Sequence, residues 1–146
     1  QAEQLRWLGG IRYSISAIIN IMAFFKKRRL QLNLADNLVD SNCLFFVALN
    51  TIHTGKGMKM APHAKLNDGL IDTILVRDVS KLRAVKIFTQ VFSGNHIFDP
   101  SVEYQQVKTF SIHTKGDLLN IDGENTGHTP INVSVVPNAL KIFADL

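Results

Sequence analysis

The spacing of apolar residues changes from helical to alternating at Arg29, and this change constrains the fold more than any other feature of the chain. Beyond that point, Leu30, Leu32 and Leu34 alternate with polar or small residues, as the buried face of a β-strand requires. Further strand patterns cover residues 43–50, 70–76, 102–113, 118–121, 131–136 and 140–144. We therefore predict a mainly β protein with accessory helices (α+β), in which the strands are mostly antiparallel.

Two segments carry helical patterns. In residues 5–25 apolar side chains recur every three or four positions, with a break or bend expected at Gly9-Gly10. The apolar part, residues 11–25, is shorter than the roughly 20 residues that span a bilayer and includes polar side chains. We expect a helix that covers an apolar pocket or lies at a lipid interface, with ordinary core packing as the alternative.

The second helix is expected after Ser80, whose hydroxyl can cap its first turn, and Gly94 is expected to end it. The side chains predicted to line its apolar face are Leu82, Val85, Phe88, Val91 and Phe92.

A length of 146 residues with 46% hydrophobic residues fits one domain with its own core. The single cysteine, Cys43, lies in an apolar run and is expected to be a core residue in a reducing compartment. The chain starts at Gln1 and enters a helical pattern directly, so we expect it to be part of a longer protein.

The net charge of +4 favours anionic partners, such as phosphate ligands, acidic lipids or nucleic acid. The densest basic cluster, residues 26–29, has no interleaved aromatic side chains, so nucleic-acid binding is not expected. Because this cluster follows an apolar helical stretch, it either complements the negative end of the helix dipole or faces an anionic membrane.

Several apparent motifs do not hold. The Gly55-Lys56 pair looks like part of a nucleotide P-loop, but Asn50 stands at the upstream glycine position and Gly57 stands where serine or threonine is needed. The five histidines show no paired helical spacing of the kind that binds zinc. Cys43 has no nearby activating base, so a catalytic cysteine is also not expected.

Two acidic glycine turns are the better candidates for chemistry. Asp68 stands between Asn67 and Gly69, where its carboxylate and neighbouring carbonyls would offer a divalent cation oxygen ligands. The alternative is an Asx turn that caps a strand. Asp122 and Glu124 flank a glycine and, if extended, point to the same side, where one holds a cation or orients the other as a proton acceptor. The alternative there is a solvated hairpin turn.

These turns belong to a set of landmarks that occur in order over nearly the whole chain. The landmarks are Arg6-Trp7-Leu8-Gly9, Arg12-Tyr13, residues 46–50, Gly55-Lys56-Gly57-Met58, Ala61-Pro62, residues 64–72, Gly94-Asn95-His96, Asp122-Gly123-Glu124 and residues 136–140. Together they resemble the C-terminal domain of the diacylglycerol, sphingosine and ceramide lipid kinases. One departure is Lys56, where many relatives have a further glycine.

The resemblance implies an architecture. Family members have an N-terminal α/β domain with the nucleotide site, followed by an antiparallel β-sandwich that helps hold the lipid. Residues 1–146 then form the C-terminal β-sandwich domain, with residues 1–28 as a helical segment leading in. The nucleotide-binding domain is absent from this chain, so the fragment alone is expected to be inactive.

The resemblance also implies roles for residues. Glu124 matches the family's proton acceptor for the lipid hydroxyl, with Asp122 beside it. In bacterial members a structural Mg²⁺ is bound in the segment that matches residues 65–70, which carries over to the Asp68 side chain and the backbone of Lys65 and Leu70.

The implied activity is ATP-dependent phosphorylation of a lipid hydroxyl by the full-length protein, with Mg²⁺ as cofactor and ATP bound through the missing domain. The helices at residues 11–25 and after Ser80 would wall the acyl-chain pocket, and the protein would be cytoplasmic and peripherally bound to membranes. Diacylglycerol, a sphingoid base and ceramide remain open as substrates, and the oligomeric state is open. The alternatives are a non-catalytic lipid-binding module and an NAD-kinase-like enzyme that acts on a soluble nucleotide.

Overall fold

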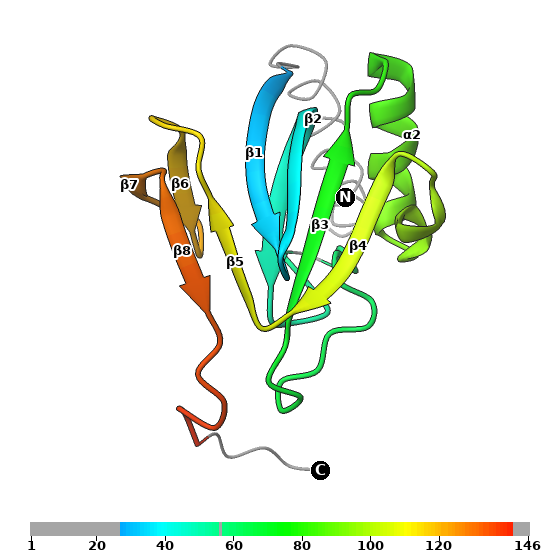
Figure 1. The fold of residues 1–146 in the computed structure, drawn as a ribbon. Helices are drawn as coiled ribbons and strands as arrows, with labels where there is room; N and C mark the ends of the chain where they lie inside the picture. The colour runs from blue at the N-terminus through cyan, green and yellow to red at the C-terminus, as the bar shows by residue number, and fades with distance from the viewer. Residues whose placement is uncertain (1–26, 56, 142–146) are drawn as a thin grey trace, which may run out of the picture.

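The computed structural model describes residues 27–55 and 57–141, which form a six-stranded antiparallel sheet, a two-stranded sheet and two helical elements (Figure 1). The strands are β1 (Arg28–Leu34), β2 (Asn37–Leu49), β3 (Ile71–Arg77), β4 (Val102–Val107), β5 (Thr109–Ile112), β6 (Leu118–Ile121), β7 (Glu124–His128) and β8 (Ile131–Ser134). The helical elements are α2 (Lys81–Val91) and the 3₁₀ turn η1 (Asn95–Phe98). The mainly β, antiparallel architecture is confirmed.

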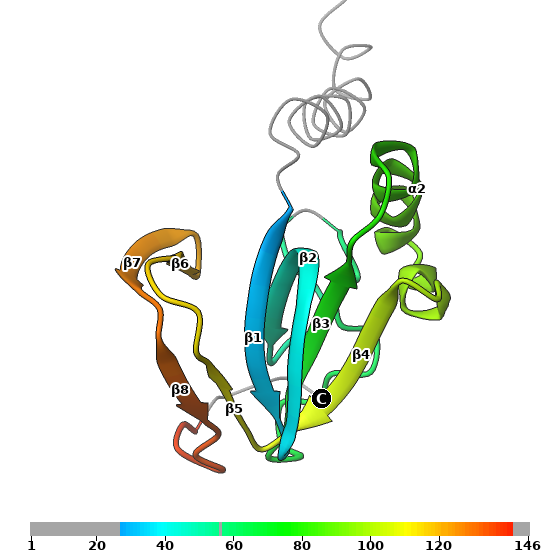
Figure 2. The same cartoon turned by 45° about the horizontal axis from the view of Figure 1, so that its top comes forward.

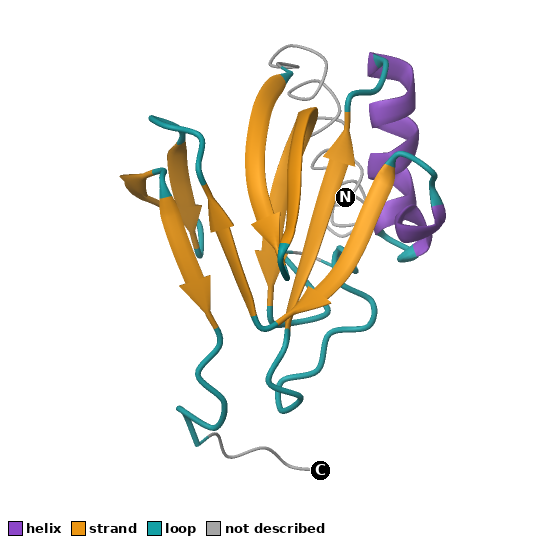
Figure 3. Cartoon of the chain, in the orientation of Figure 1, coloured by secondary structure: helices purple, strands orange, loops and turns teal. Residues whose placement is uncertain are grey.

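The larger sheet has the strand order β4-β3-β2-β1-β5-β8, and β6 pairs only with β7. Figure 2 shows that β5 and β8 diverge from β1 and β2, and that the β6–β7 hairpin lies beyond them. Figure 3 shows both helical elements on one side, beside β3 and β4. The hairpin and the helical elements therefore lie at opposite ends of the larger sheet.

The core lies on both faces of the larger sheet. Leu30, Leu32 and Leu34 are buried in one cluster, as the alternating pattern predicted. On β3, Leu75 joins that cluster, whereas Ile74 packs in a second cluster with residues of α2 and of the β2–β3 connection. Each fully buried leucine or isoleucine contributes about 1.5–3 kcal/mol. Packing on both faces explains why every residue of β3 from Asp72 to Val76 is buried.

Three strand predictions need correction. The pattern at residues 102–113 predicted one strand, but the chain changes partner at Lys108, so that β4 pairs with β3 and β5 pairs with β1. Strand β7 was not predicted, because its residues are polar and exposed and lack an alternating apolar pattern. A last strand was predicted at residues 140–144, but Leu140 and Lys141 are not in a strand and the remaining residues lie outside the described part.

Helix α2 begins where the sequence predicted, since the Ser80 hydroxyl accepts a hydrogen bond from the Arg83 N–H (3.3 Å). Its apolar face was predicted correctly only in part. Val91 is buried as predicted, but the other buried side chains are those of Ala84 and Ile87, and Leu82 is 79% exposed. Alanine is too weak a hydrophobic signal to reveal this face, although its small side chain lets the helix approach the sheet.

The helix predicted over residues 5–25 lies outside the described residues. Within residues 27–55 and 57–141, no helix is long and apolar enough to cross a bilayer.

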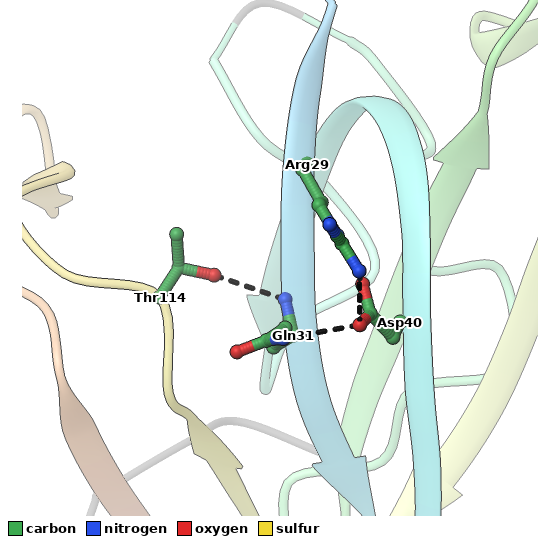
Figure 4. A network of polar contacts seen from close by, with 4 residues as sticks. All are labelled: Arg29, Gln31, Asp40 and Thr114. Atoms are coloured by element: carbon green, nitrogen blue, oxygen red, sulfur yellow. Dashed lines mark hydrogen bonds and ion pairs between the residues drawn. The ribbon is translucent and has the colours of Figure 1, made fainter.

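The basic cluster is paired with carboxylates. Both oxygens of Asp40 accept hydrogen bonds from Arg29 (2.8 Å each), and Gln31 adds a third (3.0 Å), as Figure 4 shows. Hydrogen bonds from Arg29 and Gln31 lower the pKa of Asp40 to about 2. Arg28 pairs with Asp117, and Lys27 pairs with Asp78. The charges of these three cations are therefore largely compensated within the domain, while Lys26 lies outside the described residues.

Candidate functional site

The segment predicted to bind magnesium forms a compact turn before β3. The Asp68 carboxylate accepts a hydrogen bond from the Leu70 N–H at Oδ1 (2.9 Å), which makes it an Asx turn. Gly69 has a φ of +69°, and a Cβ there would lie 3.4 Å from the Pro137 ring. The structure thus brings Asp68 and Leu70 together and packs their turn against a segment almost 70 residues away in sequence.

The donor set of this turn suits a hard cation. Asp68 takes no hydrogen bond at Oδ2 from the described residues, and the carbonyls of Lys65 and Leu70 would supply further oxygens, the ligand type that Mg²⁺ prefers. No group of three or more His, Cys, Asp or Glu side chains that could hold a metal gathers at this turn or anywhere else in residues 27–55 and 57–141. A cation here would therefore depend on one carboxylate and on backbone oxygens.

A buried histidine contacts the middle of the β2–β3 connection, the same segment that carries the Asp68 turn. The His96 Nε2 lies 2.9 Å from the Met60 carbonyl oxygen, so this nitrogen carries the proton and donates. The other ring nitrogen, Nδ1, is buried and has no hydrogen-bond partner among the described residues, and burial lowers the pKa of His96. Gly94 has a φ of +81°, and a Cβ there would lie only 3.0 Å from the Pro62 ring. Two of the sequence landmarks therefore meet at this contact.

A second buried cluster joins the connection to the sheet. Asp72 on β3 is completely buried and accepts hydrogen bonds at Oδ1 from the Tyr104 hydroxyl and the Gln106 amide, the latter at 3.0 Å. The Gln106 amide also reaches the His63 carbonyl oxygen (3.4 Å), and the His63 and Tyr104 rings meet edge to face. Burial and the neighbouring Asp72 raise the pKa of Tyr104.

No motif in the sequence assigned a role to this buried cluster. The available signal was the aspartate itself, since Asp72 stands inside an otherwise apolar strand pattern where an acid requires partners.

The predicted catalytic residues lie at the β6–β7 turn. Ile121 pairs with Glu124, which leaves Asp122 and Gly123 as a two-residue loop with φ values of +51° and +92°. Such values are those of a type I′ turn. The two carboxylates are therefore not on one extended segment, as the prediction of a shared side assumed. Both are exposed at the tip of the hairpin and are accessible to another domain or to a substrate.

The two candidate segments are not joined to each other. The 65–70 turn lies in the β2–β3 connection, whereas Asp122 and Glu124 lie on the separate hairpin (Figure 1). No hydrogen bond or ion pair among the described residues links the two. The described residues thus present two separate acidic turns and do not assemble them into one enclosed site.

Comparisons with known proteins agree with the β architecture. Residues 1–144 match a family described as the YegS C-terminal NAD kinase beta sandwich-like domain. A diacylglycerol kinase of Mycobacterium tuberculosis (strain ATCC 25618 / H37Rv) is 27% identical over 145 residues, which are 98% of this chain and 47% of the relative. A protein of Chromohalobacter salexigens named "Probable lipid kinase YegS-like" is 34% identical over 103 residues, which are 69% of this chain and 33% of the relative.

A solved structure supports the same fold. The crystal structure of a diacylglycerol kinase from Bacillus anthracis str. Sterne has a TM-score of 0.63 at 13% identity, over 83% of this chain and 44% of that chain. At this identity the match concerns the fold alone. The chain therefore spans half or less of the length of these proteins.

Proposed function

Because this chain belongs to the family of YegS C-terminal NAD kinase beta sandwich-like domains, we propose that it is the C-terminal, substrate-side domain of an ATP-dependent lipid kinase. The observation that carries this proposal is the match over residues 1–144, together with relatives that are named diacylglycerol or lipid kinases. In this proposal residues 1–146 form this single domain, residues 1–28 lead into it, and the nucleotide site would belong to a separate domain of the full-length protein. The lipid substrate that these names favour is diacylglycerol, with a sphingoid base or ceramide as alternatives.

In this proposal Glu124 is the general base. Its carboxylate accepts the proton of the lipid hydroxyl while the hydroxyl oxygen bonds to the γ-phosphorus of ATP, the bond to the bridging oxygen breaks, and ADP leaves. Asp122 orients Glu124 or the attacking hydroxyl. The exposure of both side chains on a tight turn supports these roles, since the turn is free to face a second domain that brings ATP. Phosphoryl transfer depends mainly on such positioning and on charge neutralisation.

Magnesium enters the proposal in two ways. Bound with ATP, it neutralises phosphate charge during transfer. A structural Mg²⁺ would be held by the Asp68 side chain and by the backbone carbonyls of Lys65 and Leu70. The all-oxygen donor set and the Asx turn that fixes Asp68 support this site.

The protein would act in the cytoplasm at a membrane surface, where its lipid substrate resides. Two other functions remain as alternatives, because the family description refers to NAD kinases and because the acidic turns are not assembled here. One is a kinase for a soluble nucleotide, and the other is a lipid-binding module without catalysis.

The test is phosphate transfer by the natural full-length protein. It is incubated with ATP and Mg²⁺ and a panel of diacylglycerol, a sphingoid base, ceramide and NAD. We expect labelling of one lipid and a loss of roughly 10²–10⁴-fold in kcat for Glu124→Gln, the range for loss of a general base. Asp122→Asn is assayed in the same way. Its matched control is Asp36→Asn, because Asp36 is also an exposed acid at positive φ, in the β1–β2 turn.

Each alternative has its own outcome. Labelling of NAD alone identifies a soluble-nucleotide kinase, and vesicle binding without any labelling identifies a binding module. Full activity of Glu124→Gln would remove Glu124 as the base while leaving the kinase assignment in place.

A further inference from the structure

Two side chains of β4 hold both ends of the loop that contains the candidate magnesium turn. This loop is residues 63–72, and its ends are His63 and Asp72. The Gln106 amide donates to the His63 carbonyl oxygen (3.4 Å) at one end and to Asp72 Oδ1 (3.0 Å) at the other. The Tyr104 ring meets the His63 ring edge to face, with centroids 5.5 Å apart, and the Tyr104 hydroxyl donates to the same Asp72 oxygen. Both ends are therefore bound to the same pair of side chains.

The strand register puts this pair where it reaches the loop. Asp72 is opposite Gln106 in the β3–β4 pairing, and Tyr104 is opposite Ile74 on the same face of the sheet. That face packs against residues of the β2–β3 connection, which includes the loop. Gln105 lies between the two donors on β4, so its side chain points to the other face. A shift of β4 by one residue would turn both donors away from the loop.

The carboxylate at the tip of the loop lies near the same pair. Burial is the largest cause that raises the pKa of Tyr104, the Asp72 carboxylate comes next, and the charge of Asp68 adds to both. Within residues 27–55 and 57–141, the hydrogen bonds from side chains of the sheet to the loop come from Tyr104 and Gln106. The conformation of the loop therefore depends on these two residues more than on any other part of the sheet.

The two ends of the loop are also close in sequence to the two backbone ligands. His63 is two positions before Lys65, and Asp72 is two positions after Leu70. The separation of the Lys65 and Leu70 carbonyls therefore follows the separation of the two ends. Because Gln106 is hydrogen-bonded to both ends, its loss would let one carbonyl move relative to the other.

We propose that Tyr104 and Gln106 are positioning residues that set the cation affinity of the Asp68 turn. The inference rests on the proposed function, because it concerns the structural Mg²⁺ of that proposal. With one carboxylate ligand, such a site depends on backbone carbonyls, which are in place only when the loop conformation puts them there. A loop that is already ordered loses less conformational freedom when a cation binds. Contacts that orient metal ligands typically change metal affinity by about 10–100-fold.

The test measures Mg²⁺ binding to the natural full-length protein by calorimetric titration without ATP. Binding at other places is subtracted by titrating Asp68→Asn. Gln106→Ala removes the hydrogen bonds to both ends of the loop, and Gln106 is exposed, so its removal leaves the core intact. Gln105→Ala is the matched control, because it makes the same change at the next residue of β4. We expect the Kd for Mg²⁺ to rise roughly tenfold or more in Gln106→Ala and to stay unchanged in Gln105→Ala.

A second control separates positioning from general stability. The Thr73 hydroxyl donates to the Gln105 carbonyl oxygen (3.0 Å), so Thr73→Val weakens the same β3–β4 pair without removing Tyr104 or Gln106. We expect Thr73→Val to lower the free energy of unfolding and to leave the Kd for Mg²⁺ unchanged. Hydrogen exchange of the Leu70 amide, which donates to Asp68, should become faster in Gln106→Ala but not in Gln105→Ala.

Several results overturn the proposal. They are an unchanged Kd in Gln106→Ala, an equal rise of the Kd in Thr73→Val, a rise of the Kd without faster exchange at Leu70, and binding by wild type no tighter than by Asp68→Asn.

Lipid phosphorylation separates this proposal from the proposed function. If wild type phosphorylates diacylglycerol but the Kd is unchanged in Gln106→Ala, the positioning role is wrong and the kinase assignment stands. If no lipid is phosphorylated but the Kd rises in Gln106→Ala and not in the two controls, the positioning role stands and the kinase assignment is wrong.

Discussion

The Tyr104 hydroxyl on β4 donates a hydrogen bond to the Asp72 carboxylate, which is completely buried on the neighbouring strand β3. Gln106 donates to the same oxygen, and the other oxygen, Oδ2, is buried and finds no partner in the part of the chain that the structure describes. A buried carboxylate is costly unless hydrogen bonds satisfy it, so the two donors offset part of the cost of burying Asp72. Because Gln106 also reaches the His63 carbonyl oxygen, the cluster fixes the connection that carries the candidate magnesium turn.

Replacing Tyr104 by phenylalanine removes one donor to Asp72 without changing the shape of the ring. We expect Tyr104→Phe to lower the free energy of unfolding by about 1–3 kcal/mol, the cost of a buried acceptor that loses its partner. Urea unfolding measures the change, and Lys108→Ala, at an exposed position between β4 and β5, is the control. A variant as stable as wild type would show that the Tyr104 hydrogen bond is dispensable.

The contact between Gly94 and Pro62 predicts different costs for two glycine substitutions. Both Gly94 and Gly116 have a left-handed φ, near +81° and +83°, which costs an alanine about 1–2 kcal/mol. The two glycines differ in their surroundings. A Cβ added at Gly94 would lie 3.0 Å from the Pro62 ring, whereas a Cβ added at Gly116 would have no atom within 4 Å. We expect Gly94→Ala to destabilise the chain by about 1–3 kcal/mol more than Gly116→Ala in thermal or urea unfolding. Equal costs would mean that the loop carrying Pro62 moves aside freely.

His96 makes stability depend on pH below neutrality. Burial lowers the pKa of His96 in the folded chain below its ordinary value near 6.5, so the unfolded chain binds a proton first as the pH falls. The contribution of neutral His96 is therefore present above pH 6.5 and is lost as the pH falls from there toward the lower folded pKa.

The comparison is between wild type and His96→Gln, whose amide still donates to the Met60 carbonyl. We expect the urea midpoint of wild type to fall more steeply than that of His96→Gln between pH 7.5 and pH 5. The other four histidines are the same in both proteins, so parallel curves would exclude His96 as the source of this dependence.

Two substitutions at Asp68 separate a structural role from a metal role. Asparagine keeps an oxygen that accepts the Leu70 N–H but loses the charge, whereas alanine loses both. If the turn binds Mg²⁺, a saturating concentration near 100 times Kd stabilises wild type by about 2.7 kcal/mol and leaves Asp68→Asn unchanged. Without metal, only Asp68→Ala should be less stable, by about 1 kcal/mol, since it loses the Asx turn. Thermal unfolding with and without Mg²⁺ measures both effects, and an equal Mg²⁺ shift in Asp68→Asn would place the ion elsewhere.

Local patterns in the sequence were enough for much of the fold. The alternating leucines of β1, the Ser80 cap and the Gly94 stop each depend on neighbours within a few residues, and all were observed as predicted. The Asx turn at Asp68 was one of two predictions for that segment, the other being a cation site. Local pattern offered cation or proton chemistry at Asp68, Asp122 and Glu124 only beside structural alternatives. The specific roles of Glu124 as base, of Asp122 beside it and of Lys65 and Leu70 as magnesium ligands come from family resemblance, and they stay predictions.

The sequence by itself determined the mainly antiparallel β class, because hydrophobic period and turn residues act over short stretches of chain. Only the tertiary structure decided which face of α2 is buried, where the chain passes from β4 to β5, and that Asp72 meets Tyr104. It also decided that Gly94 meets Pro62 and that Gly69 meets Pro137. These outcomes rest on contacts between residues that are distant in sequence, and such contacts depend on how the sheet curves and what covers each of its faces.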